Sequence, residues 1–331
     1  MLHPRLTVPL GLALALTACS DDEPGEATRD AAAPADLAMP EVDGGPDERD
    51  AFIALDAGLE LDAGELDGGS LEEADAGEPA GDASMGRLGA GAWIRQELAA
   101  VPALTGTFTR RTTVEAPALV HDATGCCSKY AFYVRDDEAP NDRRVGFVNV
   151  SIADLVSHDA YGAGIGTSRD FPGTILYLAD VTIEPRWPDW AGYAATNYDG
   201  MVLDGSAAIY AENLTIREYN ADTAIDIKAQ EAQLVDLTIE GPGHRTLRYW
   251  RTGPHYLVGS SLNNTGELGS GAMLWFSNCD ETVLRVYDTT FDGETTVANP
   301  RVQCDRGSRP TIEYLEVDPR TTGEMHPMFS Y

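Results

Sequence analysis

A four-residue pattern of polar and apolar positions recurs from the middle of the chain to its end. It consists of Asp or Asn, any residue, Ser or Thr, and then a large apolar residue. Complete copies begin at Asn149, Asp180, Asn213, Asp236 and Asp288, and degenerate copies begin at Gly259 and Tyr314. Successive copies start 23 to 33 residues apart. A pattern that returns at this interval indicates that the chain is built from repeated units.

Apolar residues alternate with other residues just ahead of the copies. Leu176 and Leu178 lie four and two residues before Asp180, and the same offsets recur elsewhere. The other pairs are Val145 and Phe147, Ile209 and Ala211, Ala232 and Leu234, and Leu284 and Val286. This alternation predicts a half-buried β-strand in each unit. The following Asp or Asn predicts a corner, because these residues tolerate the left-handed backbone conformation. The apolar fourth residue of each copy is then expected to point inward.

A third strand can be traced upstream of each corner. It precedes the inward apolar residue by a similar interval in most units, and by a larger interval in the longer units. The segments are Gly164–Ile165, Val202–Leu203, Ile225–Ile227, Leu247–Tyr249 and Ala272–Met273. Units that each bury only part of an apolar face must stack to close a core. The Leu-x-x-Leu-x-Leu spacing of leucine-rich repeats is missing, and propeller blades need more residues per unit.

The repeat resembles the right-handed parallel β-helix of the pectate-lyase-like superfamily, over roughly Tyr130 to Asp318. The resemblance implies an all-β fold class, a right-handed parallel β-helix solenoid of about seven coils. That superfamily includes lyases, hydrolases, epimerases, adhesins and inert spacers, so the resemblance does not select a function. Because an open stack end exposes strand edges, we expect a cap at each end. Trp93 to Leu98 is the candidate over the first coil, and Met325 to Tyr331 over the last.

The cysteines indicate one disulfide. Cys279 precedes Phe291 by almost the same interval as Cys304 precedes Val317, so the two cysteines occupy nearly equivalent places on neighbouring coils. Strands that pair are about 4.8 Å apart, which is within reach of a disulfide.

Cys126 and Cys127 are adjacent in the chain and would form a vicinal disulfide or remain thiols. A nucleophilic cysteine is disfavoured at this position because it has no paired histidine. His121 is the histidine closest to the two cysteines in the sequence.

The N-terminal part of the chain predicts export. Leu6 to Ala18 is an apolar run of 13 residues, too short for a membrane span of about 20 residues, and it is typical of a signal peptide over residues 1–18. Leu16-Thr17-Ala18-Cys19 resembles the bacterial lipobox, which implies that Cys19 is lipidated. An ordinary secretory signal is the alternative. Ser20, where an Asp favours inner-membrane retention, points to a lipid anchor in the outer membrane, with the domain periplasmic or surface-exposed.

The segment between the signal peptide and the repeats has a separate composition. From Ser20 to Ala90 it contains 21 Asp and Glu against three Arg, and Phe52 is its only aromatic residue. High like charge with little apolar surface predicts a disordered acidic tether over residues 19–90, leaving residues 91–331 for the β-helix domain. Its short Asp-Ala-Gly pieces lack the ligand spacing of a calcium-binding EF-hand loop.

The charge of the whole chain narrows the classes of partner. The formal net charge is −31, with 23 Lys and Arg against 54 Asp and Glu. Nucleic acid and anionic lipid carry negative charge, so electrostatic binding to either is disfavoured. We therefore expect no nucleic-acid partner. Membrane contact is expected only through the lipid anchor.

Polar and aromatic residues gather on the third strand of successive coils. The alternation in Ile225-Asp226-Ile227-Lys228 places Asp226 and Lys228 on the outer face, and the same argument places Arg248 and Trp250 beside them. Asp204 lies one coil earlier and Trp275 one coil later. Asp204, Asp226, Lys228 and Arg248 are the candidate catalytic residues, and Trp250 and Trp275 are candidate ligand contacts. Ordinary cross-strand pairing of surface charges is the alternative interpretation.

An aromatic-rich loop from Pro185 to Gly200 adds three further candidate ligand contacts, Trp187, Trp190 and Tyr198. It is long enough to wall a groove, or else it packs its own rings onto the stack. Gly243-His244-Arg245 resembles the Gly-His-Gly element of polygalacturonase-like hydrolases only in part. Because the other elements of that family are absent, the family is not assigned.

These features favour a lipid-anchored envelope protein that presents an elongated face to a polysaccharide or an envelope protein. A polysaccharide lyase or glycoside hydrolase with a diverged active site is the alternative, and a structural spacer is a third possibility. The sequence does not decide whether the chain is an enzyme. No cofactor and no metal are expected.

Overall fold

The structure is a computed structural model that describes residues 89–135, 142–168, 173–266 and 271–330. Every described residue belongs to the compact unit Met85–Tyr331. The expected signal peptide, the lipidation site Cys19 and nearly all of the acidic tether lie outside the described residues. Within the described ranges, every helix is too short or too polar to cross a bilayer.

The larger of two sheets, which we call sheet A, has 12 strands. Its main path is β1-β3-β5-β7-β9-β11-β14-β17-β20, and β12, β15 and β18 lie beside it. The strands are β1 Ala103–Phe108, β3 Ala118–Cys126, β5 Arg144–Ala153, β7 Thr174–Glu184, β9 Ser206–Ile216, β11 Glu231–Val235, β12 Thr238–Gly241, β14 His255–Val258, β15 Ser261–Asn264, β17 Val283–Tyr287, β18 Thr290–Phe291 and β20 Thr311–Tyr314.

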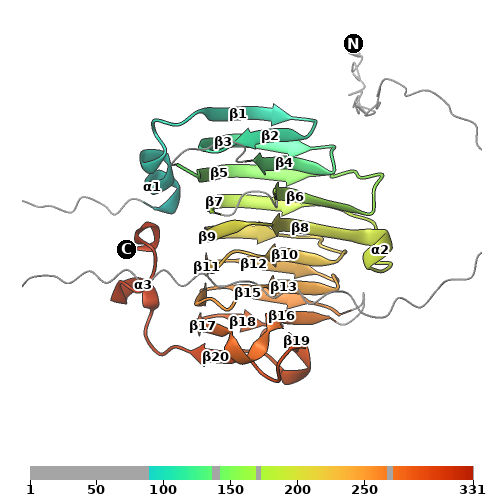
Figure 1. Cartoon of the computed structure of the whole chain (residues 1–331), viewed down its shortest axis with the longest axis vertical. Helices are drawn as coiled ribbons and strands as arrows, with labels where there is room; N and C mark the ends of the chain where they lie inside the picture. Colours follow the sequence, from blue (N-terminus) through green and yellow to red (C-terminus); the bar gives the residue numbers. More distant parts are fainter. Residues whose placement is uncertain (1–88, 136–141, 169–172, 267–270, 331) are drawn as a thin grey trace, which may run out of the picture. The chain divides into compact units, whose positions relative to one another are not determined.

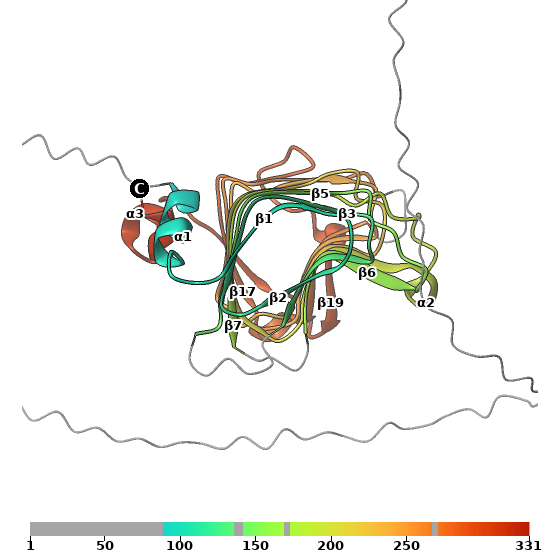
Figure 2. The same cartoon turned by 90° about the horizontal axis from the view of Figure 1, so that it is seen from above.

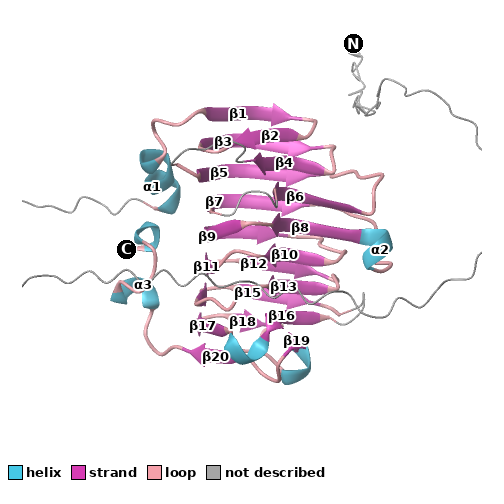
Figure 3. Ribbon diagram, in the orientation of Figure 1, coloured by secondary structure: helices cyan, strands magenta, loops and turns pink. Residues whose placement is uncertain are grey.

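The second sheet, sheet B, has eight strands in the order β19-β16-β13-β10-β8-β6-β4-β2. They are β2 Thr112–Glu115, β4 Tyr130–Arg135, β6 Tyr161–Thr167, β8 Asn197–Leu203, β10 Thr223–Ile227, β13 Arg245–Tyr249, β16 Ala272–Asn278 and β19 Val302–Arg306. Strands pair in parallel within both sheets. The chain passes from one sheet to the other and back in each turn, so the fold is an all-β solenoid (Figures 1 and 3).

The predicted strands are confirmed, and so are all the predicted corners except the last one, at Tyr314. The alternating apolar residues ahead of each corner, such as Leu176 and Leu178, are fully buried between the sheets. Asn149, Asp180, Asn213, Asp236, Gly259 and Asp288 all have a positive φ. Each corner is followed by a buried apolar residue, as Ile183 illustrates. Along this corner row the Asn213 amide donates to Asp180 at 2.6 Å and the Asn149 amide donates to Asp122 at 2.7 Å.

The stack differs from the sequence prediction at both ends. The path of sheet A has nine strands, so two turns, carrying β1 and β3, precede the first predicted copy at Asn149. Asp122 is the corner of the second of these turns. The degenerate copy at Tyr314 is wrong as a corner, because its φ is not positive and Val317, its expected inward residue, is 61% exposed.

The two predicted caps are wrong, because both segments pack on the outer side of sheet A. Helix α1 (Ala90–Glu97) contacts β5 and β7, and the η3 turn (Pro327–Phe329) lies against α1. A side chain at Gly146 would lie 2.7 Å from Ile94 and from Leu98, so this glycine permits the close approach of the helix. Figure 2 shows α1 and the short helix α3 (Pro319–Thr322) on one flank, with α2 (Tyr193–Thr196) at the opposite side.

The disulfide between Cys279 and Cys304 is confirmed, with a Cα–Cα distance of 5.7 Å. It joins the η1 turn (Cys279–Glu281) that follows β16 to strand β19, which is preceded by the η2 turn (Asn299–Arg301). Cys126 and Cys127 are half-buried and are not joined in a disulfide. Cys127 has a φ of 60° and occupies a second corner of its turn.

Candidate functional site

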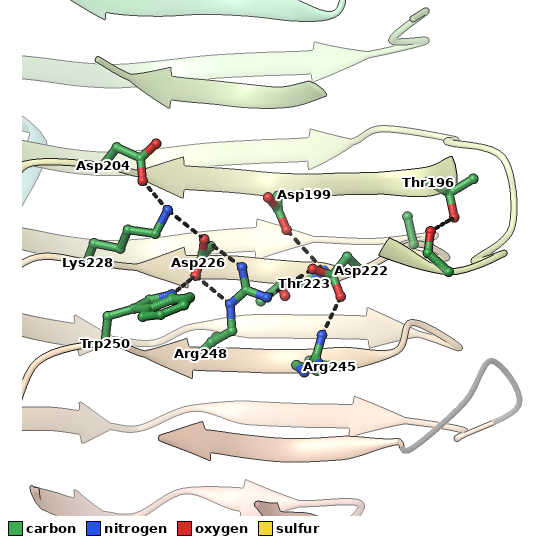
Figure 4. Close-up of polar contacts among 12 residues, drawn as sticks. Thr196, Asp199, Asp204, Asp222, Thr223, Asp226, Lys228, Arg245, Arg248 and Trp250 are labelled. Atoms are coloured by element: carbon green, nitrogen blue, oxygen red, sulfur yellow. Dashed lines mark hydrogen bonds and ion pairs between the residues drawn. The ribbon is translucent and has the colours of Figure 1, made fainter. Parts of the chain in front are cut away.

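The charged candidates predicted from the sequence gather on the side of sheet B that faces away from the core. Ile225 and Ile227 of β10 point into the core, so Asp226 between them lies on the opposite side of the strand. In the register of the sheet, Asp226 is opposite Arg248 of β13, which is opposite Trp275 of β16. Asp204 and Lys228 follow the ends of β8 and β10 (Figure 4).

These side chains are joined by close ion pairs. Arg248 donates from Nε and Nη2 to the two Asp226 oxygens, at 2.7 and 2.8 Å. Lys228 pairs with Asp204 and lies 3.4 Å from Asp226. The indole N–H of Trp250 donates to Asp226 at 2.5 Å. All four candidate catalytic residues therefore belong to one network, which also contains Trp250.

The structure adds three charged residues that were not among the candidate catalytic residues. Asp222 accepts from Arg248 at 3.0 Å and from Arg245 at 2.5 Å. Asp199 accepts at 3.1 Å from the backbone N–H of Thr223. Asp199, Asp222 and Arg245 each precede the next corner of the chain by the same interval. Counting back the same number of residues from each corner would therefore have identified these three residues as a second polar group on successive turns.

Burial and neighbouring groups shift the pKa values of Asp199 and Asp226 in opposite directions. Burial raises the pKa of Asp199 well above its usual value, and the negative charge of Asp226 raises it further. Burial also acts to raise the pKa of Asp226, but hydrogen bonds and the charge of Arg248 outweigh it, so that this pKa is lowered. Burial acts to lower the pKa of Arg248, while Asp226 raises it by more. Asp199 is therefore the carboxyl group of the cluster that favours its neutral form.

The charges of this cluster balance when Asp199 is protonated. Three carboxylates then remain, those of Asp204, Asp222 and Asp226, and each lies against one or more of three cations. The cations are Lys228, Arg245 and Arg248, and each has an aspartate partner. Asp222 and Asp226 are at most 1% exposed. Buried charges are tolerated when they are paired in this way.

Two indole rings flank the charged cluster. The ring centroids of Trp250 and Trp275 are 5.1 Å apart, with an angle of 56° between the ring planes. The Arg248 guanidinium lies 5.3 Å from the Trp250 centroid and 5.7 Å from the Trp275 centroid. Trp250 is 37% exposed, and Trp275 is half-buried. The pair offers exposed ring surface at a position fixed by the ion pairs beneath it.

The aromatic candidates in the segment from Pro185 to Gly200 are packed differently from the indole pair of Trp250 and Trp275. Trp187 and Tyr198 are buried and stack on each other with centroids 4.6 Å apart. The Trp187 indole donates to the backbone oxygen of Asp199 at 3.0 Å, and the Tyr198 hydroxyl donates to that of Asp159 at 2.6 Å. Trp190 is half-buried and stacks on His244. This geometry favours the packing interpretation for Trp187 and Tyr198, whereas Trp190 keeps part of its surface exposed.

Among the residues that the structure describes, no three His, Cys, Asp or Glu side chains are grouped so that they could hold a metal ion.

Comparison of the chain with protein-family models finds no match, and comparisons with curated proteins and with solved structures find none either.

Proposed function

We propose that this protein binds polysaccharide along the outer side of sheet B. The observation that carries the proposal is the indole pair of Trp250 and Trp275, held beside a buried ion-pair network. Sugar rings present apolar C–H faces that pack on aromatic rings, and a few fixed polar groups orient the sugar. A network of this rigidity holds the rings in place before the ligand arrives, which lowers the entropic cost of binding.

The proposal also covers the class of the fold and the location of the protein. The solenoid is a right-handed parallel β-helix like those of the pectate-lyase-like superfamily, which the parallel order of both sheets supports. The chain is anchored to the outer membrane by a lipid on Cys19, and the acidic tether separates the domain from the bilayer. Labelling of bacteria that express the full chain with a palmitate analogue tests this anchor. Incorporation that persists in Cys19→Ala would exclude the lipidation site.

Binding is tested with the full chain on immobilised neutral and acidic polysaccharides. Trp250→Ala should weaken binding about tenfold, because an aromatic contact contributes up to about 1.5 kcal/mol and about 1.4 kcal/mol corresponds to a factor of ten. Tyr314→Ala is the matched control, since Tyr314 is a comparably exposed aromatic residue (43%) on sheet A. Equal retention of the two variants on every polysaccharide would contradict the proposal.

Glycoside hydrolysis is a second candidate, supported by the separated pKa values of Asp199 and Asp226. A neutral carboxyl group beside an ionised one supplies the acid and the base that hydrolysis of a glycosidic bond requires. The binding function is favoured because both carboxyl groups are inaccessible, Asp199 being only 4% exposed and Asp226 only 1%. Reducing ends that appear with the native chain and disappear with Asp199→Asn would establish hydrolysis. Bound polysaccharide that yields no reducing ends supports recognition alone.

A further inference from the structure

One continuous row of residues crosses all eight strands of sheet B on its outer side. The pairing register aligns Thr113, Tyr133, Gly166, Val202, Asp226, Arg248, Trp275 and Gln303. Residues on either side of this row, such as Phe132 and Ile165, are buried in the core. The row therefore runs along the axis of the solenoid and includes the indole site near one end.

A second group of aromatic rings lies at the other end of this row. The ring centroids of Tyr130 and Tyr133 are 5.2 Å apart, and both residues are half-buried. The Arg111 guanidinium lies 4.1 Å from the Tyr133 centroid. This arrangement repeats that of the indole site, where an arginine also lies beside two rings.

Gly166 explains how the Tyr130 ring comes to lie along the sheet. A Cβ atom at Gly166 would be 2.6 Å from Cε1 of Tyr130, so any side chain there would displace the ring. Gly166 and Val202 occupy the row between Tyr133 and Asp226, and neither carries a charge. From Tyr133 towards Asp226, the surface between the two aromatic groups therefore consists first of a small residue and an apolar residue, and the ion pairs follow.

The spacing of the two groups sets the kind of ligand that can reach both. Tyr133 on β4 and Arg248 on β13 are separated by four strand steps, a distance of about 19 Å at about 4.8 Å per step. One sugar ring cannot contact both groups, whereas a linear chain of linked sugars laid along the row can. The aligned row and the matching ends favour such a chain.

The charges along the row select among linear glycans. At the indole end of the row, Lys228, Arg245 and Arg248 are each paired with aspartates, so a uronic acid carboxylate that binds there would require one of these pairs to break. Breaking such a pair leaves an aspartate charge uncompensated, which is costly. A neutral glycan avoids this cost, and it is also not repelled by a chain whose net charge is −31.

We propose that Tyr130 and Tyr133 form a second aromatic subsite, and that the ligand is a linear neutral glycan that spans both subsites along the solenoid axis. This inference rests on the proposed binding function of Trp250 and Trp275. It adds to that function a direction for the ligand, a minimum length and a chemical class.

Calorimetric titration of the full chain tests the second subsite. The probes are cellohexaose, maltohexaose and mannohexaose, the corresponding disaccharides, and hexagalacturonate as the acidic counterpart. Tyr133→Ala should weaken binding of the preferred neutral hexasaccharide about tenfold and leave binding of its disaccharide unchanged. Trp250→Ala should weaken binding of both lengths. Tyr133→Leu retains apolar volume for folding but removes the ring, and it should lose the same affinity as Tyr133→Ala.

Each failure has a separate signature. If both Tyr133 variants bind the hexasaccharide as tightly as the native chain while Trp250→Ala does not, the second subsite is overturned and the proposed function stands. If Trp250→Ala binds as tightly as the native chain, the proposed function itself fails. Hexagalacturonate bound as tightly as the neutral hexasaccharides, or no neutral hexasaccharide bound at all, overturns the neutral-glycan class.

Discussion

The outer sides of the two sheets differ in what covers them. On sheet A, helix α1 and the C-terminal segment cover the strands with apolar and aromatic groups, including Ile94, Phe329 and the ring of His326, which stacks on Tyr210 at 4.1 Å. On sheet B, the corresponding side carries a buried network of charges and the exposed ring of Trp250. Helix α1 and the C-terminal segment therefore cover one face, whereas the other face keeps the ring of Trp250 exposed.

We interpret the covered side of sheet A as structural and the outer side of sheet B as the proposed binding surface. Apolar contacts on sheet A stabilise the fold by removing surface from water. The charges on sheet B gain little net stability, because the cost of desolvating paired charges offsets their attraction. An arrangement that costs desolvation and still fixes two indole rings in place is typical of a binding surface. The variants below test this division.

The largest effect is expected when a buried charge on sheet B loses its partner. Arg248→Ala removes the main cation of Asp226 and one of the two cations that contact Asp222, and it should lower the free energy of unfolding by about 3–5 kcal/mol. Arg186→Ala is the control, because Arg186 pairs with Asp154 and Glu218 on the surface and should cost under about 1 kcal/mol. Urea denaturation of the full chains measures both. Equal midpoints would show that the network contributes nothing to folding.

The next effect concerns the covered face of sheet A. Ile94 of α1 is fully buried, and Ile94→Ala should cost about 2–5 kcal/mol through lost contact and a residual cavity. Gln96→Ala is the matched control on the same helix, since Gln96 is exposed. If Ile94→Ala unfolds at the same urea concentration as Gln96→Ala, the terminal segments do not stabilise the stack and the contrast between the faces fails.

The sequence predicts the repeating part of this architecture well, and physical reasons explain its limits. Asp and Asn mark the first row of corners because few other side chains tolerate a positive φ. A second row of corners also has positive φ but uses Cys127, Asp154, Arg186 and Glu218, which share no residue type. The turn at Asp122 escaped detection because Gly125 stands where the pattern requires an apolar residue.

The sequence predicted only some of the charged side chains that the structure brings together on sheet B. Alternation along β10 and β13 correctly placed Asp226, Lys228 and Arg248 on one side of the sheet. Asp199 lies near the start of β8 and Asp222 just before β10, where alternation gives no direction, so neither was among the predicted catalytic residues. The caps were misplaced because an amphipathic segment near a chain end can cover a stack end or a sheet face, and its own pattern does not distinguish them.

A pH-dependent effect should separate the two buried aspartates of sheet B. The pKa of Asp199 is raised in the folded state, so its contribution is fully present below the unfolded pKa of about 3.9 and is lost as pH rises towards the folded value. Within that window the native chain should lose about 1.4 kcal/mol per pH unit relative to Asp199→Asn, which keeps an oxygen to accept from Thr223. Asp226, with a lowered pKa, contributes in the opposite direction, and its contribution changes at pH values below this window.

Thermal melts of the native chain and Asp199→Asn between pH 4 and pH 8, on the order of one measurement per half unit, follow this difference. The Tm of the variant should rise relative to that of the native chain as pH increases. A constant difference in Tm across the range would show that Asp199 is ionised throughout, and the charge balance of the cluster would then need another proton.

The smallest effect on stability is expected where the effect on binding is largest. Trp250 is 37% exposed, and in Trp250→Ala the Asp226 carboxylate keeps both hydrogen bonds from Arg248, so the loss should stay under about 1 kcal/mol. Trp93→Ala removes a ring that packs on Tyr177 and His326 under the terminal segments, and it should cost about 2 kcal/mol or more. Urea midpoints compare the two tryptophans directly. A loss in Trp250→Ala as large as that in Trp93→Ala would make the indole of sheet B a structural element, and weakened glycan binding in that variant could then no longer be attributed to a lost contact.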